Sequence, residues 1–367
     1  MPLIQIGFLP TRPLPDGWMA SSGTIDPAFV RPYARAHDEA GYDYVLIGWS
    51  ATGPDGFTTA AFASCVTERL RFMIAHRTGF VAPTVLARKL ATLDHYSAGR
   101  AAIHIITGGN DLDQQRDGDW VDHDTRYART DEFLHLMRRE WLAPEPFDFE
   151  GKFYRVTRAF SDVKPVQQPH PTIFFGGNSP PAVATGAKHA DIYMLGSEPL
   201  AIIAERAAAI RQAAAPHGRT PRLGISTRAI LGKTEDEAWE RAFAIRDRAA
   251  RFSHLQTVRQ EWGQTDGARR ALEMAQQQPR YDKRLWTGLA PAVAGAGPVA
   301  VFVGTPEQVA EALLDYYDLG VSAFLVRGFD LDREIEEVGR EMFPILRAEI
   351  ERRDRAAAKR NGNEGAG

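Results

Sequence analysis

Short apolar runs rich in β-branched residues alternate along this chain with longer stretches of helical periodicity. Eight of these runs are typical of buried strands: 4–11, 44–48, 71–77, 101–107, 172–177, 191–196, 223–231 and 323–328. The helical stretches are 27–40, 57–68, 83–97, 128–142, 180–189, 199–216, 235–253 and 331–352. Strands that alternate with helices in this way predict an α/β fold, a (β/α)8 TIM barrel. The alternative is a doubly wound sheet, which usually has fewer strands and a glycine-rich first turn.

Two added segments follow the fourth predicted strand. Residues 109–127 form a polar stretch directly after it, and we interpret them as a loop. Residues 145–170 contain FDFEGKFYRV, in which two alternating runs surround Glu150 and Gly151. This pattern predicts a β-hairpin that is added to the barrel.

A longer insertion follows the seventh predicted strand. Residues 254–300 are rich in Gln, Arg and Gly, and a segment of this length is typical of an active-site lid. Its end, VAGAGPVAVFVG at 293–304, shares glycines with a dinucleotide fingerprint, but no strand precedes it, so we interpret it as a loop. We therefore predict one domain, 1–350, with insertions after strands 4 and 7, a mobile lid at about 254–300 and a flexible tail at 351–367.

The composition excludes several classes of protein. Lys and Arg total 44 against 47 Asp and Glu, a net charge of −3, so no strongly basic surface for nucleic acid or membrane is expected. No apolar run approaches the roughly 18 residues of a membrane span. The N-terminus lacks the pattern of a secretory signal, and Cys65 is the one cysteine. A cytoplasmic enzyme without an intrachain disulfide is the expectation.

Catalytic groups of a TIM barrel lie at the carboxyl ends of its strands. At or near these ends the sequence places cationic, hydroxyl and aromatic side chains: Thr11, Arg12, Trp49, His76, Arg77, His104, Thr107, Ser226, Arg228 and Arg327. No end carries the paired carboxylates of a glycosidase. The nearest metal-like cluster, Asp122-His123-Asp124, lies in a predicted loop, where adjacent residues point apart, so no metal site is predicted. These ends suit an anion that carries a planar aromatic group.

The run FFGGNSPPA at 174–182 ends a predicted strand with bare backbone. Its glycines allow close approach of a ligand, and Asn178 and Ser179 lie at the start of a predicted helix, where a phosphate is stabilised. The alternative interpretation is a plain strand-to-helix turn in which Ser179 caps the helix before Pro180.

Several longer motifs resemble the bacterial luciferase-like flavin monooxygenases, and within them the reduced-FMN-dependent alkanesulfonate monooxygenases. The motifs are PTVLARKLATLDHYSAGRAAIHIITGG (83–109), DHDTRY (122–127), PHPTIFFGGNS (169–179), GISTRAILGKTEDEAW (224–239), LWTG (285–288) and DLGVSAFLVRGF (318–329). They occur in the family's order and cover roughly residues 3–350. The resemblance implies the same barrel that the alternation of strands and helices predicts.

The resemblance also implies an activity. Such enzymes are oxidoreductases of two-component systems, in which a separate NAD(P)H-dependent flavin reductase supplies FMNH2. With O2 as cosubstrate, they cleave the C–S bond of a sulfonate to give sulfite and an aldehyde. The relatives are dimers or tetramers, so a homo-oligomer is expected.

The cofactor-binding residues and the position of His104 follow from the resemblance, and the other catalytic and substrate-binding residues come from the strand ends named above. The cofactor-binding set is Thr107, His123, Tyr127, Gly177, Asn178 and Ser179. The catalytic set is Arg228, His104 and Arg77. The substrate-binding set is Arg12, Trp49, His76, Ser226 and Arg327. The alternative for His104, which stands where relatives often have Asn, is a histidine buried in the barrel interior.

The chain departs from the alkanesulfonate enzymes near the substrate. Gly196 stands where they have Trp, Ser226 and Arg228 where they have Arg and His, and Phe329 where they have Tyr. The gained space and polarity favour a bulkier polar sulfonate, such as sulfoquinovose. The alternatives are a related FMNH2-dependent monooxygenase acting on a sulfone or another non-sulfonate, and a flavin-binding protein without catalytic activity.

Overall fold

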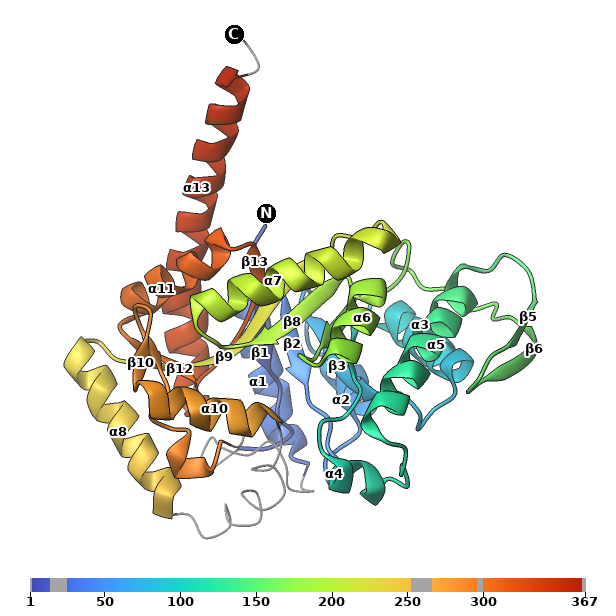
Figure 1. The fold of residues 1–367 in the computed structure, drawn as a ribbon, viewed down its shortest axis with the longest axis horizontal. Helices are drawn as coiled ribbons and strands as arrows, with labels where there is room; N and C mark the ends of the chain where they lie inside the picture. The colour runs from blue at the N-terminus through green and yellow to red at the C-terminus, as the bar shows by residue number, and fades with distance from the viewer. Residues whose placement is uncertain (1, 14–24, 252–265, 296–299, 365–367) are drawn as a thin grey trace.

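The computed structural model describes residues 2–13, 25–251, 266–295 and 300–364. Eight parallel strands form a closed barrel (Figure 1): β1 (Ile4–Phe8), β2 (Tyr44–Ile47), β3 (Arg71–Arg77), β4 (Ala101–Ile106), β7 (Ile173–Gly176), β8 (Ile192–Gly196), β9 (Arg222–Leu231) and β13 (Val321–Arg327). Each strand pairs with the next along this series, and β13 pairs with β1. The predicted TIM barrel is confirmed.

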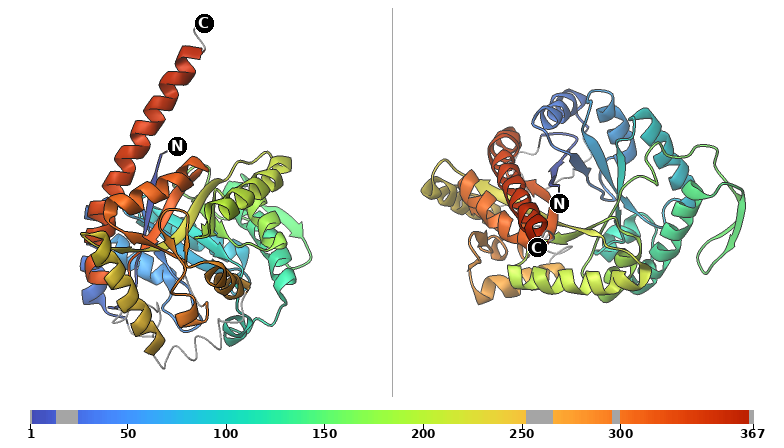
Figure 2. Two further views of the ribbon diagram at one scale, coloured as in Figure 1. Left: turned by 60° about the vertical axis from the view of Figure 1, so that its left-hand side comes forward. Right: turned by 90° about the horizontal axis from the view of Figure 1, so that it is seen from above.

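Helices surround the barrel (Figure 2, right). They are α1 (Pro27–Glu39), α2 (Gly56–Ser64), α3 (Pro83–Tyr96), α4 (Asp111–Arg116), α5 (His123–Leu142), α6 (Pro180–His189), α7 (Leu200–Ala214), α8 (Glu235–Arg251), α10 (Asp266–Gln277), α11 (Pro306–Asp318), α12 (Leu331–Glu334) and α13 (Phe343–Glu364), with short 3-10 turns at Ala215–His217 and Pro291–Val293 and a π-helical segment, η3, at Ile335–Met342. Their starts are encoded locally: Asp26, Asp55 and Asp122 cap three helices through their carboxylates, and Thr305 and Gln308 form a capping box.

Alternate residues of each strand face the barrel interior or the outer helices. The interior holds one apolar cluster: Ile6, Tyr44, Met73, Ala102, Phe174, Ile192, Met194, Ala323 and Leu325. A larger core fills the space between the strands and the helices. Residues two positions apart on a strand share the same face. Counting in steps of two from the interior cluster therefore identifies the side chains that point inward at the carboxyl ends of the strands.

Strand β9 pairs with three other strands. Its first half pairs with β8 and β13, and its second half pairs with β12 (Val301–Gly304), where Arg228 opposes Val301. The interpretation of 293–304 as a loop is therefore wrong for Val301–Gly304. These four residues form a strand because the end of β9, extending past the barrel, offers them a hydrogen-bonding edge.

The insertion after β9 builds a second core. The hairpin β10 (Arg280–Tyr281) and β11 (Leu285–Trp286) pairs with β12. Helix α8 packs against β12 and the turn at Pro291–Val293, so it is part of the insertion. Helix α11, which was not predicted from the sequence, packs beside β13. Of the predicted lid at 254–300, residues 254–265 and 296–299 lie outside the described residues.

The other predicted additions differ in detail. Strands β5 (Phe147–Glu150) and β6 (Arg155–Ala159) form the antiparallel hairpin expected within 145–170. The predicted loop 109–127 instead holds helix α4 and the first turn of α5, which begins at His123. In the predicted tail, residues 351–364 continue helix α13, which projects from the body beside the N-terminus (Figure 1).

His76 lies on the outer face of β3, which corrects its predicted role in binding substrate. Its ring packs among Phe57, Phe133 and Trp49 and is 1% exposed. Neither ring nitrogen has a hydrogen-bond partner, and burial lowers the pKa of His76 to about 3. The side chain is a neutral member of an aromatic cluster.

Gly224→Ala tests the close packing of the barrel interior. A Cβ at Gly224 would lie 2.4 Å from Met194 Sδ and 3.0 Å from Ala323 Cβ, so we expect a cost of about 1–3 kcal/mol and a lower melting temperature. Gly196→Ala is the matched control, because its Cβ would meet nothing within 4 Å. Equal melting temperatures for the two variants would contradict this packing.

His76→Phe tests the buried neutral imidazole. The unfolded histidine, with a pKa near 6.5, takes up its proton before the folded one, so wild-type stability falls as pH drops below about 6.5. Between pH 7 and pH 5 the variant should gain about 2 kcal/mol over the wild type in free energy of unfolding. His217→Phe, at an exposed position, should gain nothing; a similar gain there would refute the assignment.

Candidate active site at the carboxyl end of the barrel

Five predicted site residues share the inward face of their strands. Arg77 follows Met73, His104 follows Ala102, and Arg327 follows Leu325 at even spacing from the interior cluster. Ser226 and Arg228 follow Gly224, whose missing Cβ faces Met194 and Ala323. The fold therefore brings these side chains to one end of the barrel, as predicted.

The turn after β7 has the features of a phosphate cradle. Gly177 has a φ of +146°, and a Cβ there would lie 2.7 Å from Ala182 Cβ and 3.0 Å from the Tyr127 hydroxyl. Tyr193 donates a hydrogen bond of 2.7 Å to the Gly177 carbonyl and so fixes this peptide. Ser179 precedes helix α6, but its Oγ makes no capping bond and is buried without a partner. Ser179 therefore stands at the N-cap position before Pro180, as the alternative interpretation has it, but its side chain does not cap the helix.

Donors at this turn come from few groups. Pro180 and Pro181 have no N–H, so the first turn of α6 offers fewer backbone donors than an ordinary helix N-terminus. The unpartnered Ser179 hydroxyl and the half-buried Asn178 supply the side-chain groups. A phosphate fits here chiefly because of these side chains and the close glycine backbone.

Tyr127 completes this side of the site from helix α5. Burial raises the pKa of its phenol, while the nearby Ser179 and Thr107 side chains act in the opposite direction. The exposed His123 ring lies edge-on to the Tyr127 ring at 5.0 Å, and its Nδ1 lies 2.7 Å from an Asp124 carboxylate oxygen. The structure thus gathers the predicted cofactor-binding set around one turn.

His104 lies on the inward face of β4, close to the same turn. A Cβ at Gly176 would lie 3.5 Å from the His104 ring, and His104 Nδ1 is buried without a partner. Burial lowers the pKa of His104 to about 4, so the imidazole is neutral at neutral pH. A neutral ring with an unpartnered nitrogen can donate or accept one hydrogen bond from a ligand.

Arg77 is already neutralised by a neighbour. Its guanidinium forms a buried ion pair with Asp113 of α4 and donates a second bond, of 3.2 Å, to the Asp113 carbonyl. Asp113 also accepts the N–H of Ala51. Arg77 therefore fastens α4 over the barrel with its charge paired to Asp113, and its catalytic role stays a prediction.

Arg228 and Arg327 lack such a neutralising partner. Arg228 is 2% exposed; it donates one bond of 2.6 Å to the Gly328 carbonyl and stacks 4.4 Å from the centroid of Phe329. Arg327 stacks 3.6 Å from the centroid of Phe8, and its Nε is buried without a partner. Neither forms an ion pair with a carboxylate in the described part of the chain. Burial lowers the pKa of both groups, and an unpaired buried cation is costly unless a ligand compensates it.

Two buried polar residues near the site were not predicted from the sequence. Glu334 is 1% exposed and accepts the Gly328 N–H at 2.8 Å through Oε2, while its Oε1 is buried without a partner. Gln114 donates to the Thr107 carbonyl at 3.0 Å and fills the space that a side chain at Gly108 would need. Both contacts form only in the folded chain, and no local sequence pattern indicates them.

The remaining predicted residues differ in how firmly they are placed. Ser226 is half-buried beside Gly196, its register partner on β8, where the space is open. Trp49 stacks parallel to Phe80 at 6.3 Å, and its indole N–H is buried without a partner. Arg12 is half-buried, with its Nε unpartnered.

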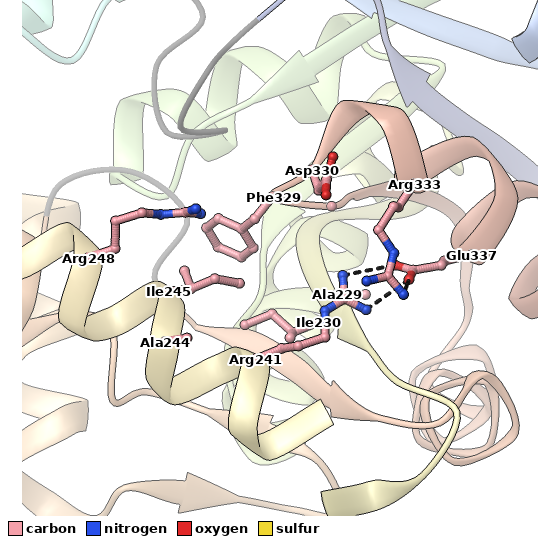
Figure 3. A pocket seen from close by; sticks show the side chains of 11 residues that line it. Ala229, Ile230, Arg241, Ala244, Ile245, Arg248, Phe329, Asp330, Arg333 and Glu337 are labelled. Carbon is pink, nitrogen blue, oxygen red and sulfur yellow. Dashed lines mark hydrogen bonds and ion pairs between the residues drawn. The ribbon is translucent and has the colours of Figure 1, made fainter. Parts of the chain in front are cut away.

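A cavity of about 310 Å³ lies outside the barrel, between α8 and the segment from Gly328 to Glu337 (Figure 3). Ile230, Ile245 and Phe329 form its apolar wall, and Arg241 and Arg333 both pair with Glu337 at its edge. No predicted site residue lines it, but Gly328 and Phe329, which contact Arg228, form part of its wall, so it adjoins the candidate site from outside the barrel.

No described helix is long and apolar enough to cross a membrane. Within the described ranges no group of three or more His, Cys, Asp and Glu side chains could hold a metal ion. In the Asp122-His123-Asp124 segment, the carboxylate of Asp122 caps helix α5 and His123 contacts Asp124.

Solved structures share this fold over nearly the whole chain. An EDTA monooxygenase from Chelativorans sp. BNC1 matches with a TM-score of 0.76 and 18% identity, over 95% of this chain and 94% of that chain. A riboflavin lyase with modified FMN and the substrate riboflavin matches with a TM-score of 0.74 and 20% identity, over 95% and 92%. A long-chain alkane monooxygenase matches with a TM-score of 0.74 and 18% identity, over 95% and 92%.

The family assignment rests on the sequence itself. A family model described as luciferase-like monooxygenase matches residues 8–323, which is most of the chain and runs from the end of β1 to the start of β13. The chain therefore belongs to the luciferase-like monooxygenase family.

Proposed function

We propose that this protein is an FMNH2- and O2-dependent monooxygenase that cleaves the C–S bond of an organosulfonate. The observation that carries the proposal is the pair of guanidinium groups of the buried Arg228 and the half-buried Arg327, neither of which has an ion-pair partner among the described residues. Arginine N–H groups match the oxygens of a sulfonate in geometry and charge. The open space beside Gly196 gives room for the organic part of the substrate.

The flavin phosphate fits the turn after β7, where Ser179 Oγ is unpartnered and glycine leaves the space that a Cβ would fill. Tyr127, Asn178 and Thr107 complete this binding set. His104 would hydrogen-bond the ring system through a neutral imidazole. When bound, the reduced flavin supplies the two electrons that oxygenation with O2 requires. A separate NAD(P)H-dependent flavin reductase supplies it.

The overall reaction balances as a monooxygenation. Sulfonate, O2 and FMNH2 give aldehyde, sulfite, FMN, water and one proton; one oxygen atom enters the aldehyde and the other leaves as water. Arg228 and Arg327 hold the head group through these changes and stabilise the negative charge on the departing sulfite. Both act by charge and not by proton transfer, because a guanidinium keeps its proton.

Release of sulfite tests the reaction. With a generic flavin reductase, NADH, FMN and O2, the wild type should release sulfite from at least one of octanesulfonate, methanesulfonate and sulfoquinovose. Arg228→Met should lower kcat/KM by about 30-fold or more, since a buried charged partner is lost, without unfolding the protein. Arg248→Met, at an exposed arginine of the outer cavity, is the control and should retain activity.

Activity on a sulfone or a hydrocarbon, without sulfite from any sulfonate, would contradict the sulfonate assignment. It would favour the alternative, a related FMNH2-dependent monooxygenase that acts on a non-sulfonate substrate. Reduced flavin that binds without any oxygenated product would favour a flavin-binding protein. Sulfite from sulfoquinovose in preference to the two alkanesulfonates would assign the open space at Gly196 to a sugar.

Selectivity for FMNH2 over reduced riboflavin tests the phosphate turn. The wild type should bind FMNH2 at least about tenfold more tightly under anaerobic conditions, because riboflavin lacks the phosphate. Gly177→Ala should remove most of this preference, since the added Cβ meets Ala182 and the Tyr127 hydroxyl. Gly218→Ala has a left-handed backbone but no neighbour within 4 Å, and it should keep the preference; its loss there would contradict the assignment.

A further inference from the structure

The backbone of Gly328 links Glu334 to Arg228 through two successive peptide groups. The N–H of Gly328 donates to Glu334 Oε2 at 2.8 Å, and the carbonyl of the same residue accepts from Arg228 at 2.6 Å. A Cβ at Gly328 would lie 3.3 Å from Glu334 Cβ, so glycine permits the close approach of the two elements. The position of the Arg228 guanidinium therefore depends on the carboxylate of Glu334.

Charge connects the same residues. Burial raises the pKa of Glu334, while the positive charges of Arg327 and Arg228 act to lower it. Asp330 also faces this carboxylate, but it is exposed at the start of α12, where water screens its charge. The charged groups are thus the guanidinium ions of the buried Arg228 and the half-buried Arg327 and the carboxylate of Glu334. The phenols of Tyr33 and Tyr42 also face Glu334 and add no charge, because burial raises their pKa. Arg77 adds nothing to this sum, because Asp113 neutralises it in a buried ion pair.

Arg228, Arg327 and Glu334 retain donor and acceptor atoms that no described residue satisfies. Arg228 uses one hydrogen bond to the protein, Arg327 Nε has no partner, and Glu334 Oε1 has none. Buried polar atoms normally have partners, so this set of open groups indicates a ligand that completes them. One extra positive charge calls for a ligand with a single negative charge.

We propose that Arg228, Arg327 and Glu334 act as one charge unit with a single excess positive charge, which binds a monoanionic head group. In this proposal Glu334 is the positioning residue that holds Arg228 through the backbone of Gly328. The inference rests on the proposed function only in taking this head group to belong to the substrate. It adds a residue from the loop after β13 to the determinants of specificity.

Two variants separate the charge of Glu334 from its hydrogen bond. Glu334→Gln removes the charge and keeps an oxygen that can accept the Gly328 N–H, whereas Glu334→Ala removes both. Glu337→Gln is the matched control, because Glu337 lies on the next helical turn but pairs with Arg241 and Arg333. Thermal melting shows that each variant is folded before binding is measured.

Two probes of equal chain length differ in charge. Octanesulfonate is a monoanion throughout the working pH range, and octylphosphonate gains a second negative charge as pH rises. Affinities are measured by calorimetry with and without saturating FMN. The wild type should bind the phosphonate monoanion in preference to its dianion. Glu334→Gln should raise the affinity for the dianion relative to octanesulfonate by about tenfold or more, and Glu334→Ala should weaken sulfonate binding by a similar factor.

An unchanged dianion-to-monoanion ratio in Glu334→Gln, or the same change in Glu337→Gln, would overturn the inference. So would a wild type that binds neither probe. The two proposals fail separately: if octanesulfonate binds with the predicted dependence on Glu334 but no sulfonate yields sulfite, the proposed reaction is wrong and the charge unit stands. If sulfite forms and the ratio does not respond to Glu334, the reaction stands and the charge unit is wrong.

Discussion

Hydrogen bonding of β9 to three strands sets the geometry of the candidate site. The first half of β9 closes the barrel between β8 and β13, and its second half leaves the barrel to pair with β12. Arg228 lies where the strand divides, with Arg327 and Val301 as its register partners. The inward guanidinium at this point is buried by the insertion and by the Gly328–Phe329 segment, which places an uncompensated charge away from water. In low-dielectric surroundings such a charge attracts an anion far more strongly than it would at the surface.

The arginines at this end of the barrel have different roles because of their partners. Arg77 has a direct carboxylate partner in Asp113, and this ion pair holds α4 in place. Among the described residues Arg228 bonds only to a carbonyl, and Glu334 is linked to it through the backbone of Gly328 rather than by a direct ion pair. A charge that is positioned without being neutralised is what an anion receptor requires, since a direct ion pair would compete with the ligand. At the turn after β7, which is separated from β9 by β8 alone, Gly177 and Ser179 offer space and an unpartnered hydroxyl.

Local patterns predicted those parts of the fold and the site that depend on local sequence. The eight barrel strands and the turn at FFGGNS follow from periodicity and from glycine at a strand end, and both are present. Strand β12 was missed because VFVG follows a Gly- and Pro-rich run, and its structure depends on the free edge of β9, which is distant in sequence. The ion pair of Arg77 with Asp113 and the contact of Glu334 with Gly328 depend on tertiary structure in the same way. The error at His76 was avoidable: adjacent strand residues face opposite sides, so an inward Arg77 already requires an outward His76.

The central claim is that a sulfonate head group binds between Arg228 and Arg327 while a flavin phosphate binds at the turn of Gly177 and Ser179. A crystal structure of the protein with FMN and octanesulfonate tests it most directly. The account predicts sulfonate oxygens within hydrogen-bonding distance of the Arg228 guanidinium and the phosphate against Ser179 Oγ. A sulfonate bound only in the outer cavity between α8 and η3, with both arginines still unpartnered, would contradict it.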